Sequence, residues 1–432
     1  MSDLGQAASF ASGLYRQRVG TVYAGYVNRD PLALLRLRPG RVDPYSIYER
    51  MRASGPLAPT RLGDWVSTSH RVCAAVLRDR RFGAVPAGGD QRRPEDEIEA
   101  SFLTMNPPDH TRLRRLARPS FSPKAMAGYR GLIEQSVAGL LDRAAVRDTF
   151  DLIPAFASPL PITVITELLG VPEEDSDGFA EYGASLADAL DGIRSLRHAA
   201  RLQADSDKLS RLFERLLELR RREPRDDIVS RLVAAEGDQV RPEEIMPLCV
   251  LLLIAGFETT VNLIGNAVLA LLDHPDQWRA LCEDPAGLAP KAVEETLRYD
   301  PPVQRTNRYA LEAVELEGER VGKGQVVVTL IGAANRDPEV YERPGSFDIQ
   351  REPGPEHLAF SSGVHYCVGQ PLARLEATIA LRMLAERMPG LTLAGAIRRR
   401  NTTTIRGPIQ VPVTAGAART PRGSAPAAPK CA

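Results

Sequence analysis

The stretch that decides the fold is Phe360-Ser-Ser-Gly363-Val-His365-Tyr-Cys367-Val-Gly369, and it runs directly into the helical pattern 370–376. Cys367 therefore lies at the N-terminus of a predicted helix. Unpaired backbone N–H groups and the positive end of the helix dipole favour a thiolate at such a place. The two flanking glycines allow a sharp turn and the close approach of a flat ligand. The pattern predicts a metal-ligating cysteine, and a buried structural thiol is the alternative.

The composition is that of an ordinary globular protein. Of the 432 residues, 43% are hydrophobic and 25% are charged, which is enough apolar sequence for a large core. Lys and Arg total 55, as do Asp and Glu, so the net charge gives no indication of a nucleic-acid or membrane partner. The five cysteines lack CxxC pairs, and the first twenty residues lack a long apolar anchor. We therefore expect a cytoplasmic protein that binds neither nucleic acid nor a membrane.

Apolar periodicity predicts a mainly α-helical fold with a small β region. The longest helical pattern covers 241–272, with Pro242 near its start and Pro275 beyond its end. Short apolar runs around three glycines in 309–333 predict small antiparallel strands. No linker or repeat divides the interior. The expected organisation is an N-terminal lead-in at 1–40, one domain at 41–413 and a disordered tail at 414–432.

Inside the long helical pattern lies Ala255-Gly256-Phe-Glu258-Thr259-Thr260. Ala255 and Thr259 are four residues apart and so share a face, where small side chains leave space for a ligand. A Thr hydroxyl can compete for the carbonyl four residues back and so open the helix to water. The pattern indicates a polar notch in an apolar helix. The alternative is a helix-packing contact at Ala255 and Gly256 with a solvated Glu258.

Two further pairs share helical faces. Glu295 and Arg298 are three residues apart, and such a pair is usually a surface ion pair worth about 0–1 kcal/mol. His110 and Arg114 are four apart and could bind carboxylates, because guanidinium groups match carboxylate geometry. A solvated basic face is the alternative for the second pair. A zinc site at His365 and Cys367 is excluded, since the sequence has no further cysteine or histidine cluster to complete it.

Taken in order, these segments resemble the motifs of the cytochrome P450 family. The Cys367 loop is similar to the family's ligand loop, 255–260 to its oxygen-binding motif, and 295–298 to its ExxR signature. The run from Ala334-Asn-Arg-Asp-Pro338 to Phe347-Asp-Ile-Gln-Arg351 is similar to the segment that supplies the ExxR partner. The resemblance extends over about residues 40 to 410. It is most specific where the last four motifs occur together.

The resemblance implies a haem b between the long central helix and the Cys367 loop, with the thiolate as axial iron ligand. It implies that Thr259 and Glu258 support protonation of iron-bound dioxygen. Glu295, Arg298 and Arg351 would form a structural network, with Arg336 as a competing partner. The remaining haem contacts that it implies are His110, Arg114, Ala255, Gly256, Arg308, Phe360, Gly363, His365 and Gly369.

The implied reaction is monooxygenation, in which one atom of dioxygen enters a small hydrophobic substrate by hydroxylation or epoxidation, in natural-product tailoring. Electrons from NAD(P)H would arrive through a ferredoxin and its reductase, because no flavin or iron–sulfur segment follows the motifs. The exposed Arg112, Arg115 and Arg118 could dock such a donor. We expect a monomer. Other haem-thiolate oxidations, such as coupling or peroxide-driven reactions, and a non-catalytic binding protein on the same fold are the alternatives.

The substrate pocket can be located only through the resemblance. It implies contributions from the 82–104 loop, the 171–208 region and 302–304. The individual side chains that it places there are Ile254, Val303 and Thr403.

Overall fold

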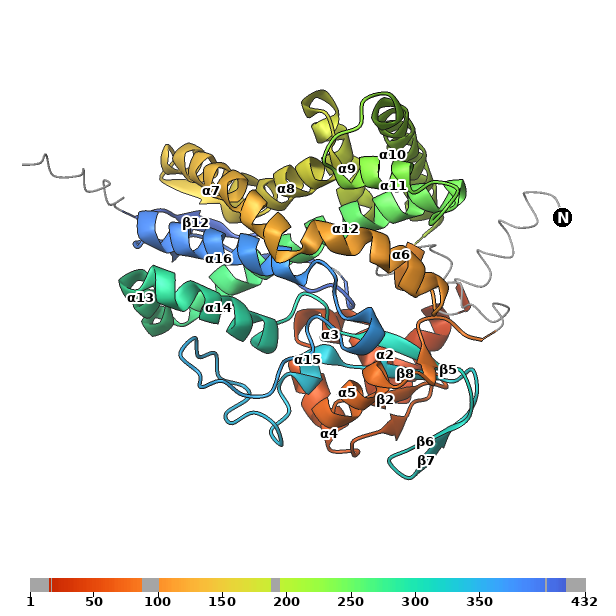
Figure 1. The fold of residues 1–432 in the computed structure, drawn as a ribbon. Helices are drawn as coiled ribbons and strands as arrows, with labels where there is room; N and C mark the ends of the chain where they lie inside the picture. Colours follow the sequence, from red (N-terminus) through yellow and green to blue (C-terminus); the bar gives the residue numbers. More distant parts are fainter. Residues whose placement is uncertain (1–14, 17, 88–100, 188–194, 401, 417–432) are drawn as a thin grey trace, which may run out of the picture.

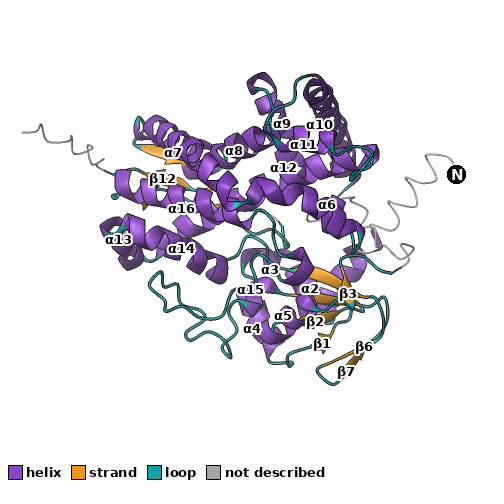
Figure 2. Ribbon diagram, viewed as in Figure 1, coloured by secondary structure: helices purple, strands orange, loops and turns teal. Residues whose placement is uncertain are grey.

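The computed structural model describes residues 15–16, 18–87, 101–187, 195–400 and 402–416. Its helices form most of the molecule, the strands of the largest sheet lie together with the N-terminal helices, and a smaller group of strands lies near α7 (Figure 2). This is the mainly helical fold with a small β region that the sequence predicts. The predicted tail at 414–432 falls largely outside the described residues.

The centre of the helical part is α12, Pro242–Asp273. Pro242 occupies its first turn, and the Glu244 carboxylate accepts a hydrogen bond from the Arg241 backbone N–H at 2.9 Å, so the N-terminus is capped. Helices α8, α9, α14 and α16 pack around it, which is why it is buried on nearly every face. It is long and apolar enough to cross a membrane, but 72% of its most apolar stretch is buried within the protein, as in a core helix.

The other helices surround α12 or cover the sheet (Figure 1). Those on the helical side are α6 Asp109–Ala117, α7 Pro123–Ala145, α8 Pro159–Leu169, α9 Ser176–Ala187, α10 Leu196–Arg222, α11 Ile228–Ala234, α13 Pro275–Glu283, α14 Pro285–Tyr299 and α16 Gln370–Arg387. Those near the sheet are α2 Pro31–Leu35, α3 Arg38–Val42, α4 Tyr45–Arg52, α5 His70–Arg78 and α15 Ile331–Ala334. Short 3-10 or π turns are η1 Tyr23–Val27, η3 Ser101–Thr104, η4 Arg118–Phe121, η5 Ile153–Ala157, η6 Glu173–Asp175 and η8 Gly363–His365.

The largest sheet has the strand order β1-β2-β8-β5-β3, in which only β2 and β8 run parallel. Its strands come from 58–83 and 306–329, so the sheet ties the N-terminal segment to the region after α14. The strands are β1 Ala58–Pro59, β2 Trp65–Ser67, β3 Phe82–Gly83, β5 Thr306–Ala310 and β8 Val326–Thr329. Three smaller sheets contain β4 Thr149–Asp151, β9 Thr392–Leu393 and β12 Pro412–Thr414; β6 Val314–Leu316 and β7 Glu319–Val321; and β10 Arg398–Arg399 and β11 Pro408–Gln410.

The main core joins α12 to its neighbours, and a second core lies under the large sheet. Leu32 and Leu35 belong to the second core and are 0% and 4% exposed, although the sequence places them in a lead-in. The folded part of the chain therefore begins before residue 40. Cys73 and Cys249 are buried at 0% exposure, consistent with structural thiols.

Candidate functional site

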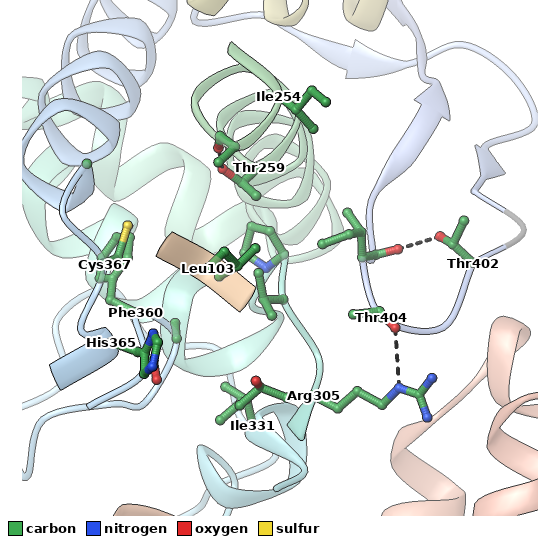
Figure 3. Close-up of a pocket in the computed structure, with 18 of the residues that line it drawn as sticks. Leu103, Ile254, Thr259, Arg305, Ile331, Phe360, His365, Cys367, Thr402 and Thr404 are labelled. Carbon is green, nitrogen blue, oxygen red and sulfur yellow. Dashed lines mark hydrogen bonds between the residues drawn. The ribbon is translucent and has the colours of Figure 1, made fainter. Parts of the chain in front are cut away.

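A cavity of about 820 Å³ lies between α12, the 358–369 loop and the strand β5. Cys367 and Phe360 line one side of it, and Thr259 and Ile254 approach from α12 (Figure 3). Arg305 and Thr404 lie on the side away from Cys367. The volume is within the range of small-molecule and cofactor sites. The cavity is therefore the candidate active site.

Cys367 sits between η8 and α16, and its backbone N–H donates to the Phe360 carbonyl at 2.8 Å. The bond closes the loop and directs the thiol into the cavity. Burial raises the pKa of Cys367, while the N–H groups of Gly369 and Gln370 and the nearby Arg114 guanidinium oppose that shift. The sequence argument considered only the helix N-terminus, which favours the thiolate, whereas burial of the thiol favours its neutral form. A coordinated metal ion favours the thiolate.

The two glycines of the loop have different functions. Gly363 has φ = 67°, and a Cβ at this position would overlap the carbonyl oxygen of Leu77 at the end of α5. Gly369 has a negative φ, and an added Cβ would only reach the Phe121 ring at 3.6 Å. The first glycine is thus required by the turn and by packing against α5. The second leaves the cavity floor open beside Cys367.

We expect Gly363→Ala to destabilise the protein and to reduce the fraction that holds haem. A non-glycine residue at this φ costs about 1–3 kcal/mol, to which the overlap with Leu77 adds. Thermal unfolding and haem content per chain are the measurements. Gly354→Ala is the matched control, since an added Cβ meets nothing within 4 Å there. Equal stability of the two variants would contradict the account of the loop.

The α12 notch is formed by hydroxyl groups that bond back to the helix. The Thr259 hydroxyl donates to the Ala255 carbonyl at 2.7 Å, and that of Thr260 donates to the Gly256 carbonyl at 3.1 Å. Ala255, Gly256 and both threonines line the cavity. A Cβ on Gly256 would lie 2.9 Å from the Ile165 side chain. Gly256 therefore also serves close packing of α12 against α8.

Glu258 is not solvated, contrary to the alternative that the sequence left open. It is 1% exposed, and its Oε1 atom lies 2.7 Å from the Arg400 guanidinium and accepts from the Asn262 amide at 2.9 Å. Burying a carboxylate requires such partners, because an unpaired buried charge is costly. The Glu258 carboxylate is thus fixed by its two partners, one residue before the cavity-facing Thr259.

Basic groups converge on the cavity near Cys367. His110 and His365 come from α6 and η8, and their ring centroids are 4.2 Å apart. Burial, followed by Arg114 and Arg308, lowers the pKa of His110 to about 4. Burial and the neighbouring cations lower the pKa of His365 to about 3, and burial lowers that of Arg308 to about 10. The two imidazoles are therefore neutral at pH 7 beside two guanidinium groups.

This cluster fits the carboxylates of a haem. Neither ring nitrogen of the buried His110 has a hydrogen-bond partner in the described part of the chain. Buried polar groups are nearly always paired, so these nitrogens indicate a ligand that can accept from the single N–H of the neutral ring. Arg308, 6% exposed, donates to Thr306 and to the Asn307 carbonyl but still lines the cavity. Two propionates would complete these bonds, and Cys367 supplies a soft ligand suited to iron.

The Glu295 network lies behind the loop. The Arg298 Nε and Nη2 atoms each donate to Glu295 at 2.8 Å, and the Arg351 Nε atom lies 3.2 Å from the same carboxylate. Arg298 also donates to the carbonyls of Asn335, Pro344 and Ser346. Arg336 is not the partner of Glu295: it lies between the rings of Tyr45 and Tyr299. Glu295 and Arg298 are 4% and 3% exposed, so the pair is internal.

Only some of the residues and regions expected in the substrate pocket line the cavity. Ile254, Val303 and Thr403 line the cavity, as do Ala84, Phe102 and Leu103 from the 82–104 region. Residues 88–100 and 188–194 lie outside the described residues. The described part of 171–208 does not line the cavity, because α9 and α10 pack on each other and on the outer side of α12. Gln304 faces Tyr48 instead, which donates to it at 3.1 Å.

Arg112, which the sequence offered as a docking residue, is bound within the protein. It donates to both Glu244 oxygens at 2.7 and 2.8 Å and to Asp109 at 2.8 Å. It therefore ties α6 to the start of α12. Arg115 and Arg118 are exposed.

Several functional candidates were missed by sequence reasoning. Glu376 is 2% exposed and lines the cavity, and burial raises its pKa well above the ordinary value, which favours the neutral acid. Arg400 was also missed, because nothing in the sequence around it indicates that it pairs with Glu258. Arginines also line the wall at the other end of the cavity. Four come from the N-terminal segment and one lies next to β5; they are Arg18, Arg36, Arg38, Arg41 and Arg305.

Comparison with known proteins places this site in a family. The family model described as cytochrome P450 matches residues 287–387. The cytochrome P450 monooxygenase PikC of Streptomyces venezuelae is 40% identical over 81% of this chain and 85% of its own length. The polyketide biosynthesis cytochrome P450 PksS of Bacillus subtilis is 36% identical over 86% and 96%.

A solved structure supports the same assignment. P450BioI in complex with hexadec-9Z-enoic acid ligated acyl carrier protein superposes with a TM-score of 0.81 at 40% identity, covering 86% of this chain and 98% of that chain. Identity at this level over most of both chains shows common membership as well as a common fold. The chain belongs to the cytochrome P450 family of haem monooxygenases.

Proposed function

We propose that this enzyme inserts one atom of dioxygen into a C–H bond or an alkene of a small hydrophobic organic compound in natural-product tailoring. The observation that carries the proposal is a single cavity lined both by the Cys367 thiol and by the Thr259 notch of α12. A haem bound here would supply the cleavage of dioxygen, with the Cys367 thiolate as its ligand and the Thr259 hydroxyl as a proton donor. Thr259 also favours dioxygen over a peroxide-driven reaction.

Residues of the chain have five functions in this proposal. Haem iron bound to a thiolate supplies the activation of dioxygen, and the protein supplies orientation and protons. Cys367 would hold the iron, and Phe360, Gly363 and Gly369 shape the loop around the thiol. His110, Arg114, Arg308 and His365 would bind the propionates of the haem. Ala255 and Gly256 leave space for it in the cavity. Thr259, with Glu258 behind it, holds and passes protons, while Glu295, Arg298 and Arg351 keep the loop in place.

Substrate and partners follow by analogy with the relatives. Apolar side chains such as Ile254, Val303 and Leu103 favour a hydrophobic substrate, and Thr403 also lines the cavity. PksS is named for polyketide biosynthesis, which supports a natural-product role. We further propose that a ferredoxin and its reductase deliver the electrons of NAD(P)H in the cytoplasm, with exposed Arg115 and Arg118 as docking residues.

The experiment is a binding screen followed by isotope labelling. Polyketide lactones, long-chain fatty acids and steroids are added to the haem-loaded enzyme, and displacement of axial water is followed in the haem difference spectrum. The compound with the largest change is then turned over with ferredoxin, reductase and NADPH under ¹⁸O₂. One labelled oxygen atom per product molecule is expected. Product without the label, or formed only with peroxide, would contradict the proposal.

The Thr259→Ala variant should retain haem but divert electrons into hydrogen peroxide. Without the hydroxyl, the proton is no longer delivered in a fixed geometry, and loss of such a group costs about 10²–10⁴-fold in the assisted step. Product and peroxide per NADPH consumed are the measurements. Thr163→Ala is the control, because Thr163 makes the same kind of bond, to the Pro159 carbonyl at 3.0 Å, on an exposed face of α8. Unchanged coupling in Thr259→Ala would remove this residue from the proton path.

A further inference from the structure

Positive charge gathers on the wall of the cavity. Seven arginines line it, and among the described residues of the wall Glu376 has the only carboxyl group, whose neutral form is favoured by burial. The whole chain, by contrast, has 55 basic and 55 acidic residues, so the excess of positive charge is local. A cavity lined by charges of one sign attracts ligands of the opposite sign. The wall therefore favours an anionic ligand.

The arginines of the wall form two groups on different sides of the cavity. Arg308 donates to the Ser361 hydroxyl in the Cys367 loop at 3.4 Å and belongs to the cluster that fits the haem propionates. The Arg305 side chain lies on the side away from Cys367 and donates to the Thr404 hydroxyl at 3.3 Å (Figure 3). The group around Arg305 is therefore apart from the propionate site.

This second group lies where the cavity meets the surface, and we call it the mouth arginines; its members are Arg18, Arg36, Arg38, Arg41 and Arg305. Arg18 and Arg38 are exposed, whereas the other three are half-buried, so the group extends from the solvent into the cavity. Half-buried charges act more strongly on a ligand than exposed ones, because less water screens them.

Contacts within the protein hold parts of this group in place. Arg36 lies 3.8 Å from the buried Asp64, and the Arg41 Nη2 atom donates to the Arg36 carbonyl at 3.1 Å. A guanidinium group has five N–H donors, so it can keep such a contact and still bind a ligand. The mouth arginines are thus a positioned set of donors with a shared positive charge.

The rest of the wall is largely apolar. Leu103 and Val303 line it together with Ile254 of α12. Small-molecule sites typically combine such apolar walls, which take the body of the ligand, with a few polar groups that fix its orientation. A ligand that contacts both parts of the cavity has an apolar body and one anionic end.

We infer that the substrate of this enzyme carries a carboxylate, which the mouth arginines bind while its apolar body extends toward Thr259. The inference rests on the proposed function in one respect, the use of this cavity for the substrate. Guanidinium groups suit a carboxylate, because two parallel N–H donors match its two oxygen atoms. Binding at the mouth orients the substrate so that its carboxylate lies away from the Thr259 notch.

The test uses probes that share one apolar body and differ in charge. Dodecanoic acid, its methyl ester and dodecyltrimethylammonium are titrated into the haem-loaded enzyme at neutral pH, where the acid is ionised, and binding is measured by calorimetry. The acid should bind about tenfold or more tightly than the ester, as expected for a charge-assisted hydrogen bond, and the ammonium compound should bind most weakly. Lithocholic acid and its methyl ester repeat the comparison with a rigid body.

Variants then connect this preference to the mouth arginines. Arg305→Gln should reduce the affinity for the acid about tenfold and leave that for the ester unchanged. Arg38→Gln, in the exposed part of the group, should act in the same direction by up to about fivefold. Arg279→Gln is the matched control, because Arg279 is exposed on α13 and does not line the cavity. Haem content and circular dichroism confirm that each variant is folded.

Two further measurements separate charge from shape. Arg305→Lys should recover part of the affinity for the acid, because it keeps the charge and loses the paired donors. Raising the salt concentration from about 0.05 M to about 0.5 M should weaken binding of the acid and leave binding of the ester unchanged, because salt screens charges near the surface.

The inference is overturned if acid and ester bind equally for both bodies, if neither acid binds, or if Arg279→Gln loses as much affinity for the acid as Arg305→Gln. These outcomes are separate from failure of the proposed function, because binding is measured without turnover. An acid that binds through the mouth arginines but yields product without the ¹⁸O label would contradict the monooxygenase reaction and leave the carboxylate site in place.

Discussion

The Glu295→Gln variant is expected to yield little haem-loaded protein and to unfold at a lower temperature. Glu295 balances two guanidinium groups, Arg298 at 2.8 Å and Arg351 at 3.2 Å, and also accepts from the Asp348 backbone N–H at 2.9 Å. A neutral amide leaves both cations without a counter-charge, and removing one partner of a buried pair costs about 3–5 kcal/mol. The 342–351 segment that these arginines fasten would loosen first. Thermal unfolding and haem content per chain are the measurements.

The control for this variant is Glu342→Gln, nearby in sequence to Arg351. Glu342 has a side chain that is 92% exposed and lies 3.9 Å from Arg343, so its pair is worth about 0–1 kcal/mol. Wild-type stability is expected for it. Normal haem incorporation in Glu295→Gln would show that the buried pair does not support the haem loop.

The Cys367→Ser variant should lose the monooxygenase reaction. The substitution keeps the size of the side chain and the backbone bond from residue 367 to Phe360, so the loop should still form. A hydroxyl does not supply the thiolate that favours cleavage of the O–O bond at iron. Product formation with ferredoxin, reductase and NADPH should fall to the background without enzyme. Folding is monitored by circular dichroism.

Cys282→Ser is the matched control, since Cys282 is partly buried on α13, away from the cavity. It should retain the wild-type rate. Activity in Cys367→Ser at a level comparable with this control would contradict the assignment of the iron ligand.

Elements whose ends are marked by nearby prolines or glycines could be predicted from the sequence. The long helix was expected at 241–272 and is found at Pro242–Asp273, because prolines at both ends fix where it starts and stops. The cavity-facing positions of Thr259 and Ala255 follow from spacing on that helix. The Cys367 loop likewise depends on residues that are close in sequence.

Contacts between distant segments could not be predicted in the same way. Glu258 and Arg400 are far apart in the chain, and nothing near either residue indicates the other. From the sequence, Gly256 was expected to leave space for a ligand. In the packed structure it also accommodates the Ile165 side chain of α8. The pKa of Cys367 is raised by burial that a local argument about the helix terminus does not include. Within the described residues 171–187 and 195–208, the polar composition reflects the outer faces of α9 and α10 and not a pocket wall.

The reduced carbon monoxide adduct reports directly whether Cys367 is a thiolate ligand of haem iron. The adduct of the wild-type enzyme should show the strongly red-shifted Soret band of thiolate ligation, and Cys367→Ser should lack it. A wild-type spectrum like that of a histidine-ligated globin would contradict the account.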